Sequence, residues 1–168
     1  MKLDDIIQHS LEEFVKDIFA NHWYGKEREA ISLYAFGYLL RHRQSDGVLY
    51  DPRQIGIEVR VPKPTQLGKK KEVCKDLVIC QKPSMTCWNG DKKLQNYPLA
   101  VLEWKTVLKW KTNEPNVSAY DVKWLRAFSA DSPKFIGYAI CLDLSERNFR
   151  LTCTRVQSGS AKKDWLVL

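Results

Sequence analysis

Residues 98–105, Pro-Leu-Ala-Val-Leu-Glu-Trp-Lys, decide the fold because a run of apolar residues ends here in a charged Glu-x-Lys triplet. An apolar run of this length predicts a strand that is buried on both faces. Side chains alternate along a strand, so Glu103 and Lys105 follow Val101 on one face. The glutamate and the lysine are therefore expected together, at the end of a buried row.

The segments around this strand predict a mixed α/β sheet. Period-two alternation and apolar runs predict further strands at residues 54–61, 73–80, 135–142 and 149–156. Helical spacing predicts helices before residue 21, from about residue 26 to 43, and from about 118 to 130. The order is α-α-β-β-β-α-β-β, and the last helix is long enough for a right-handed parallel crossover. We expect a mixed central sheet flanked by helices.

Two of these segments carry an expected apolar face. In residues 54–61 the alternation places Ile55, Ile57, Val59 and Val61 on one side of the strand. In the second helix, Glu29 begins a face that continues through Leu33, Phe36 and Leu40. This spacing places Glu29 at the rim of an apolar stripe.

The composition fits one globular domain. The chain has 168 residues, of which 44% are hydrophobic and 28% charged. We divide it into an N-terminal helix (1–25), a core (26–142) and a C-terminal strand and tail (143–168). No apolar stretch approaches the ~18 residues that a membrane helix needs, and the first residues lack the pattern of a signal peptide. The expectation is a cytoplasmic protein without a membrane partner.

The charge and the cysteines narrow the classes of function. The net charge of +7 suits a polyanionic partner, although it also suits plain surface solubility. The five cysteines form no C-x-x-C pair, and the three histidines all lie before residue 43, so a zinc site and a Ser-His-Asp triad are not expected.

A second acidic residue precedes the apolar part of the neighbouring strand. Asp76 stands directly before Leu-Val-Ile in residues 73–80, and it approaches Glu103 if the two strands pair. Two carboxylates at the end of a sheet suit a hard cation such as Mg²⁺, whose bound water can act as a nucleophile. Lys105 beside them can orient that water or stabilise charge on a phosphate.

Asp76 with Glu103-Trp104-Lys105 resembles the D…(D/E)-x-K signature of the PD-(D/E)XK nuclease superfamily, which has the restriction-endonuclease-like fold. The αβββαβ core of that family matches the predicted order of elements between residues 27 and 142. The resemblance implies a hydrolase, a metal-dependent endonuclease acting on DNA. Asp76, Glu103 and the Trp104 carbonyl would hold Mg²⁺ or Mn²⁺, and Lys105 would be the catalytic lysine.

The resemblance extends to the first core helix, and it also has departures. Many members of the family carry a glutamate on that helix, and Glu29 fits the place by its face. The proline that often precedes the family's aspartate is absent, since this chain has Cys74-Lys75-Asp76. A long insertion also separates the two acidic strands.

The candidates for contact with nucleic acid are basic and aromatic residues in loops, together with one lysine on the third helix. They are Lys69, Lys70, Lys71, Trp88, Lys92, Lys93 and Lys123. For the lysine run the alternative is a solvated loop. Tyr120 and Asp121, next to Lys123, match a helix that faces the site in the family, but loosely.

Other interpretations stay open. Glu103 and Lys105 are alternatively a solvent-facing pair, Asp76 a loop residue and Glu29 a partner of the helix dipole. Glu58, with Arg60 beside it, is a competing acidic candidate. A catalytically inactive protein of the same fold, which binds nucleic acid or a protein partner, is the main alternative function, and an unrelated accessory protein is a third. An active enzyme of this size is expected as a homodimer or as a subunit of a larger nuclease complex, and RNA is not excluded as a substrate.

Overall fold

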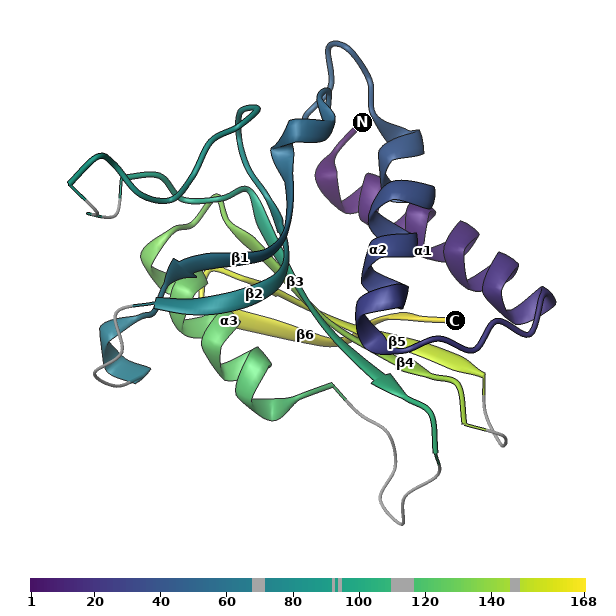
Figure 1. The fold of residues 1–168 in the computed structure, drawn as a ribbon. Helices are drawn as coiled ribbons and strands as arrows, with labels where there is room; N and C mark the ends of the chain where they lie inside the picture. Colours follow the sequence, from purple (N-terminus) through teal and green to yellow (C-terminus); the bar gives the residue numbers. More distant parts are fainter. Residues whose placement is uncertain (68–71, 92, 94, 110–116, 146–148) are drawn as a thin grey trace.

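The computed structural model describes residues 1–67, 72–91, 93, 95–109, 117–145 and 149–168 (Figure 1). Its helices are α1 (Leu3–Ala20), α2 (Glu27–Gly37) and α3 (Ala119–Asp131), with short 3-10 turns at Leu39–His42, Pro52–Gln54 and Thr65–Leu67. Its strands are β1 (Ile55–Pro62), β2 (Glu72–Ile79), β3 (Ala100–Val107), β4 (Ile136–Asp143), β5 (Arg150–Gln157) and β6 (Ser160–Val167).

The strands form one mixed sheet in the order β1-β2-β3-β4-β5-β6. β3 and β4 run parallel and are connected through α3, whereas the other neighbouring strands are antiparallel. The helices α1 and α2 cover one face of the sheet and α3 covers the other (Figure 1). The prediction of a mixed α/β sheet flanked by helices is confirmed.

The expected C-terminal tail is wrong, because residues Ser160–Val167 form the edge strand β6. β6 returns from β5 through a two-residue turn, with Ser158 at φ 49° and Gly159 at φ 75°. Positive φ at both central residues is typical of the type I′ turns that join hairpin strands. The Ser-Gly dipeptide was the sequence signal for this turn.

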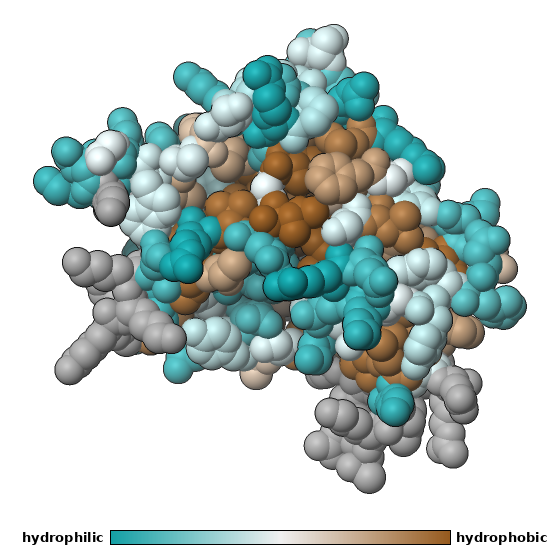
Figure 2. Space-filling model, in the orientation of Figure 1, coloured by the Kyte–Doolittle hydropathy of each residue, from teal (hydrophilic) through white to brown (hydrophobic). Residues whose placement is uncertain are grey.

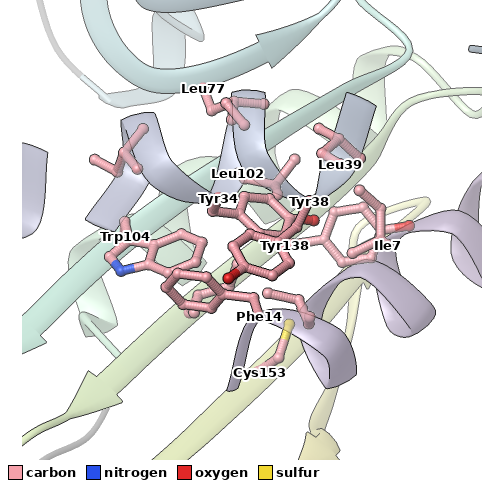
Figure 3. Close-up of a cluster of buried hydrophobic side chains, with 14 of the residues drawn as sticks. Ile7, Phe14, Tyr34, Tyr38, Leu39, Leu77, Leu102, Trp104, Tyr138 and Cys153 are labelled. Carbon is pink, nitrogen blue, oxygen red and sulfur yellow. The ribbon is translucent and has the colours of Figure 1, made fainter. Parts of the chain in front are cut away.

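The larger core lies between the sheet and the two N-terminal helices. Its aromatic centre contains Phe14 from α1, Tyr34 from α2, Trp104 from β3 and Tyr138 from β4 (Figure 3). The Phe14 ring meets the Trp104 ring edge-on at 5.8 Å between centroids. Towards β1 this cluster reaches the surface, where Ile57 is half-buried and hydrophobic side chains gather between β1 and α2 (Figure 2).

The predicted apolar face of α2 is wrong by about one residue position. The helix buries Ala30, Ile31, Tyr34 and Ala35, whereas Phe36 is 59% exposed. Both stripes have helical spacing, so the sequence permits either one. Packing against Phe14 and Trp104 selects the stripe that contains Tyr34.

The smaller core lies between the sheet and α3. Trp124, Leu125 and Phe128 of α3 pack over Val101 of β3 and Ala139 of β4. The rings of Trp124 and Phe128 stack at 4.7 Å between centroids. This layer fixes α3, and with it the residues that α3 presents near the end of β3.

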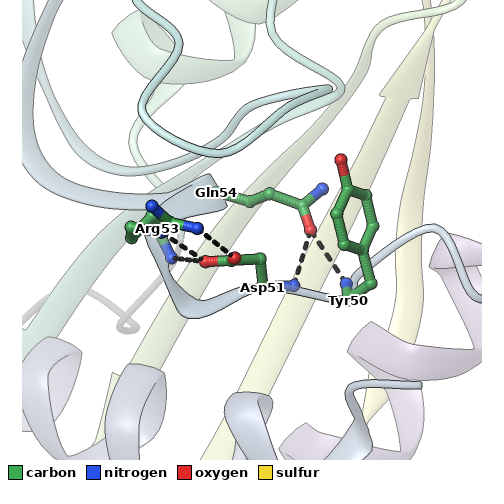
Figure 4. A network of polar contacts seen from close by, with 4 residues as sticks. All are labelled: Tyr50, Asp51, Arg53 and Gln54. Atoms are coloured by element: carbon green, nitrogen blue, oxygen red, sulfur yellow. Dashed lines mark hydrogen bonds and ion pairs between the residues drawn. The ribbon is translucent and has the colours of Figure 1, made fainter. Parts of the chain in front are cut away.

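The loop before β1 is fastened by Gln54, which is fully buried. Its Oε1 accepts hydrogen bonds from the backbone N–H groups of Tyr50 and Asp51 at 2.8 and 3.0 Å (Figure 4). Its Nε2 donates to the carbonyl oxygen of Cys80 at 3.1 Å, which ties the loop to the end of β2. Hydrogen bonds from Arg53 hold the pKa of Asp51 down at about 2.

Candidate active site

The site is built where β2 separates from β3. The two strands pair only from Leu77 opposite Leu102 to Ile79 opposite Ala100. Beyond this point β2 stays with β1 as far as Glu72, whereas β3 continues along β4 as far as Val107. In the described part of the chain, the divergence leaves part of one edge of β3 without a neighbouring strand.

Two carboxylates take the place of the missing strand. Oδ2 of Asp76 accepts a hydrogen bond from the backbone N–H of Trp104 at 2.7 Å. Oε2 of Glu27, at the start of α2, accepts one from the backbone N–H of Thr106 at 3.0 Å. Because N–H groups two residues apart point to the same edge of a strand, both acidic side chains are held beside β3.

One pocket of about 380 Å³ collects these side chains. It is lined by Glu27, Asp76, Glu103, Trp104, Lys105, Ser118 and Asp121. Four carboxylates thus come from four different elements, α2, β2, β3 and α3. The Trp104 indole packs on the opposite face against Phe14 and Tyr34, so its flanking residues Glu103 and Lys105 face the pocket.

Lys75 is a buried partner of the site that sequence reasoning missed. It is 3% exposed, and its ammonium forms an ion pair with Oε1 of Glu103. The Lys75 Nζ also lies 4.0 Å from the centroid of the Trp124 ring, which is a cation–π contact. Lys75 therefore fixes the Glu103 side chain from the α3 side of the sheet.

A change of face in β1 and β2 explains how Lys75 reaches α3. Leu77 packs in the core beneath α1 and α2, whereas Lys75, two residues earlier, contacts Trp124 on the other face. On the paired strand, Ile57 belongs to the first core and Val59 to the second, so the predicted common face of β1 is wrong. Glu58 between them has φ 54°, a left-handed conformation that interrupts the alternation.

Burial and mutual repulsion raise the pKa of both central carboxyl groups. Burial raises the pKa of Glu103 to about 8, and the charges of Asp76 and Asp121 add to the rise while Lys75 opposes it. Burial also raises the pKa of Asp76, with Asp121 adding to it, although the Trp104 N–H and a hydrogen bond with Glu103 lower it. The acidic groups of the pocket therefore lie close enough together to oppose one another's ionisation.

The donor set of this pocket suits a hard divalent cation. Mg²⁺ is usually held by one or two carboxylates together with water and substrate phosphates, and Asp76 and Glu103 supply two. Among the described residues, no group of three or more His, Cys, Asp or Glu side chains has an arrangement that could hold a metal ion. Asp76 and Glu103, with the Trp104 carbonyl, are the groups in this pocket that could hold such a cation, and the two carboxylates form a pair rather than a larger cluster.

The structure brings four of the predicted site residues together and leaves one outside. Asp76, Glu103, Trp104 and Lys105 line the same pocket. Glu29 is exposed, and its Oε2 accepts a hydrogen bond from the backbone N–H of Lys26 at 2.6 Å, so it caps α2.

Glu27 occupies the place that was predicted for Glu29. The two glutamates stand in the same first turn of α2, but successive helical residues are turned by about 100°, so they point in nearly opposite directions. Both were visible in the sequence. The choice between them depends on how α2 packs against β3, which no local pattern reveals.

The competing acidic candidate Glu58 lies elsewhere. It is exposed and forms an ion pair with Arg28 at 2.6 Å, whereas Arg60 pairs with Glu72. Neither Glu58 nor Arg60 lines the pocket between α2, β2 and β3.

The predicted nucleic-acid contacts fall into three groups. Lys69, Lys70, Lys71 and Lys92 lie outside the described residues. Lys93 and Lys123 are exposed, the first in the segment before β3 and the second on α3. Trp88 is half-buried, and its Nε1–H donates to the Arg60 carbonyl at 3.2 Å, so part of its ring is already used in packing.

Comparison with protein family models, with curated proteins and with solved structures finds no match for this chain. In the part of the chain that the structure describes, no helix has both the length and the apolar character needed to cross a membrane.

Proposed function

We propose that this chain is a divalent-metal-dependent nuclease of the PD-(D/E)XK type, an endonuclease that hydrolyses phosphodiester bonds in DNA. One observation carries the proposal: Asp76, Glu103 and Lys105 line a single pocket at the fork between two strands, and Glu27 reaches it from the preceding helix. The order of elements supports it, since α2, three strands, α3 and a parallel fourth strand follow one another as in that family's core.

The residues divide the work of phosphodiester hydrolysis between them. Asp76 and Glu103 would hold Mg²⁺ or Mn²⁺, which when bound activates water and neutralises charge on the phosphate. Lys105 is exposed at the rim of the pocket, where its ammonium can contact a phosphate oxygen and stabilise the charge that develops on it. Lys75 holds Glu103 in place from below, and Glu27 keeps the edge of β3 aligned.

The test compares wild type with Asp76→Asn and Lys105→Ala on plasmid, single-stranded DNA and RNA, with Mn²⁺ or EDTA. Wild type should give products only with Mn²⁺, and both variants should lose cleavage while keeping the circular dichroism spectrum of the folded protein. Lys16→Ala, an exposed lysine on α1, is the matched control and should cut like wild type. Cleavage by Asp76→Asn at the wild-type rate, or no Mn²⁺-dependent product from wild type, would overturn the proposal.

The buried ion pair favours a second candidate function. Because Lys75 already sets a positive charge against Glu103, the pocket also suits a catalytically inactive protein of the same fold that binds nucleic acid or a protein partner. Titration calorimetry separates the two functions. The nuclease should give a Mn²⁺ binding heat that Asp76→Asn abolishes, whereas the inactive protein should give no such heat and should bind DNA without products.

The proposed nuclease also carries expectations about its setting. A cytoplasmic location fits DNA as the substrate. Cleavage of both strands fits a homodimer or a place in a larger nuclease complex, which would bring two pockets onto one duplex.

A further inference from the structure

A second cavity, of about 600 Å³, opens between α3 and the β5–β6 hairpin. Small apolar side chains form most of its wall: Val117, Ala119, Val122, Ala127, Ala130 and Ala161. The residues that pack α3 on the sheet, Trp124, Leu125 and Phe128, do not line it. It is therefore a separate space beside the helix, and it is no part of the pocket at the β2–β3 fork.

Among the described residues that line this cavity, those with a charge are all cations. Lys123 and Arg126 come from α3, and Lys163 comes from β6, so positive charge stands on both walls. The Arg126 Nε–H donates to the Gly159 carbonyl at 2.9 Å, which fixes the guanidinium at the hairpin turn. The turn is further held by Ser129, whose Oγ accepts the Gly159 N–H at 2.9 Å.

The floor of the cavity carries a polar side chain. Thr154 of β5 is 4% exposed and lines the cavity. Its hydroxyl can donate or accept a hydrogen bond. A ligand with a hydrogen-bonding edge could therefore bond to it from within the cavity.

We infer that this cavity binds an unstacked base of the nucleic acid whose backbone crosses the proposed active site. A base has two flat apolar faces that pack on small aliphatic side chains and a polar edge that can reach Thr154. The phosphates on either side of that base meet Lys123, Arg126 and Lys163. An acyl chain with one anionic head would use a cation on one wall only, so the two-sided placement favours a polyanion.

The position of the cavity fits the same strand. The first turn of α3 separates the two spaces, with Ser118 and Asp121 facing the active-site pocket and Val122 and Lys123 facing the cavity. Asp121 and Arg126 are about 7.5 Å apart along the helix axis, at a rise of about 1.5 Å per residue. The two spaces are therefore neighbours along α3, within reach of one strand. The inference rests on the proposed function only for the identity of that strand.

The experiment measures binding without cleavage, in EDTA, by fluorescence anisotropy. The probes are a labelled twelve-nucleotide oligo(dT) and an abasic strand with the same number of phosphates. Wild type should bind oligo(dT) roughly fivefold or more tightly than the abasic strand, as expected for one base held in a pocket. The double variant Ala127→Leu/Ala130→Leu, which fills the cavity, should bind both strands equally. Ala20→Leu, on the exposed end of α1, is the control and should keep the preference.

A second variant tests the cations without filling the cavity. Lys123→Gln/Lys163→Gln should weaken binding to both strands and reduce the slope of log Kd against log salt by about 0.7 for each phosphate that the variant no longer neutralises. Lys16→Gln/Lys82→Gln makes the same change of charge at exposed lysines elsewhere and should leave the slope unchanged.

The outcomes separate this inference from the proposed nuclease. If wild type shows Mn²⁺-dependent cleavage but binds both strands equally, base binding in the cavity is overturned and the proposed nuclease is supported. A base preference that Ala127→Leu/Ala130→Leu abolishes, in a protein that never cleaves, would support the cavity and overturn the nuclease. Laurate could instead bind to wild type and not to the filled variant, while the affinity for oligo(dT) is the same for both proteins. That result would show an acyl chain as the occupant and overturn the inference.

Discussion

Single residues at the fork between β2 and β3 show how one side chain can serve both the fold and the site. Asp76 and Glu27 accept backbone hydrogen bonds that a neighbouring strand would otherwise take, and both line the acidic pocket. The ammonium of Lys75 lowers the free-energy cost of ionising the buried Glu103 carboxyl group, although burial still raises its pKa. Removing any of these groups is therefore expected to alter stability as well as chemistry.

The raised pKa of Glu103 predicts how stability depends on pH in metal-free buffer. The folded protein keeps this proton up to about pH 8, whereas an unfolded glutamate releases it near 4.5. The folded state thus binds more protons between these values, so the free energy of unfolding should fall as pH rises from about 4.5 to about 8. Glu103→Gln mimics the protonated form. It should match wild type near pH 5 and exceed its stability near pH 8 and above, by an amount on the order of a few kcal/mol.

Urea unfolding at several pH values between 5 and 9, in EDTA, checks this dependence. Glu12→Gln, a change on α1 away from the pocket, should keep the wild-type pH slope. Parallel pH profiles for wild type and Glu103→Gln would show that the proton is not held at Glu103.

Among the elements, α1 and α2 show which of two possible faces packing selects. Phe14 of α1 is fully buried at the centre of three aromatic contacts, whereas Phe36 of α2 is 59% exposed. Both residues are phenylalanines in helices with regular apolar spacing. The contacts of Phe14 with Tyr34, Tyr38 and Trp104 distinguish it from Phe36.

Alanine substitution at these two phenylalanines tests the assigned faces. Phe14→Ala should lower the free energy of unfolding by roughly 3–5 kcal/mol because it leaves a cavity in the larger core. Phe36→Ala should change it by no more than about 0.5 kcal/mol, since it removes an exposed ring. Chemical denaturation measures both, and a larger loss for Phe36→Ala than for Phe14→Ala would restore the face predicted from the sequence.

The β5–β6 turn depends on the left-handed conformation of Gly159. Gly159→Ala should destabilise by roughly 1–2 kcal/mol, because a side chain at φ 75° is strained. An added Cβ would meet only Ala130, at an ordinary 3.6 Å, so steric overlap does not account for the loss.

Gly90 is the matched control for that substitution. Among the described residues, no heavy atom lies within 4 Å of a Cβ added at Gly90, and Gly90 has no positive φ. Gly90→Ala should therefore be neutral or stabilising by up to about 1 kcal/mol. Equal Tm shifts for the two glycine variants would mean that the turn does not need the left-handed residue.

At the scale of the whole molecule, the carboxylate of Asp4 links α1 to β4 and β5. Both oxygens of Asp4, on α1, accept hydrogen bonds from Arg155 of β5 at 2.7 and 2.8 Å. The Tyr138 hydroxyl of β4 donates to the same carboxylate at 2.6 Å. Burial by itself raises the pKa of Asp4. The hydrogen bonds from Arg155 and Tyr138, with the charge of Arg155, together lower this pKa by more than burial raises it, so the net change is downward.

Asp4→Asn should destabilise the protein by roughly 1–3 kcal/mol at pH 7, because Arg155 loses its charged partner. A lowered pKa in the folded state means that the contribution of Asp4 is present above about pH 4 and is lost as pH falls through the folded value. The difference between wild type and Asp4→Asn should therefore shrink in acid. Thermal unfolding from pH 3 to 7 measures it, and Asp46→Asn in an exposed turn is the control. A constant difference across this range would contradict the role of the ion pair.

The parts of the fold that the sequence predicted are those with a local pattern. The apolar run before Glu103 predicted a buried strand, and β3 is buried from Ala100 to Trp104. The strand β6 was missed because its first five residues are exposed, which weakens any alternation. The change of face in β1 and β2, between Ile57 and Val59 and between Lys75 and Leu77, was missed as well. The alternation of apolar residues in the sequence does not show that Glu58 has a left-handed conformation.

The sequence by itself determined that Glu103 and Lys105 share one face of a buried strand and that Asp76 begins the apolar part of another. These properties follow from the two-residue period of a strand, which neighbouring residues encode. Only the tertiary structure decided that Glu27 enters the pocket, that Lys75 pairs with Glu103 and that a cationic cavity lies beside α3. Each of these depends on how elements far apart in the chain are rotated and packed against one another, and packing of that kind is set by the shape of the whole core.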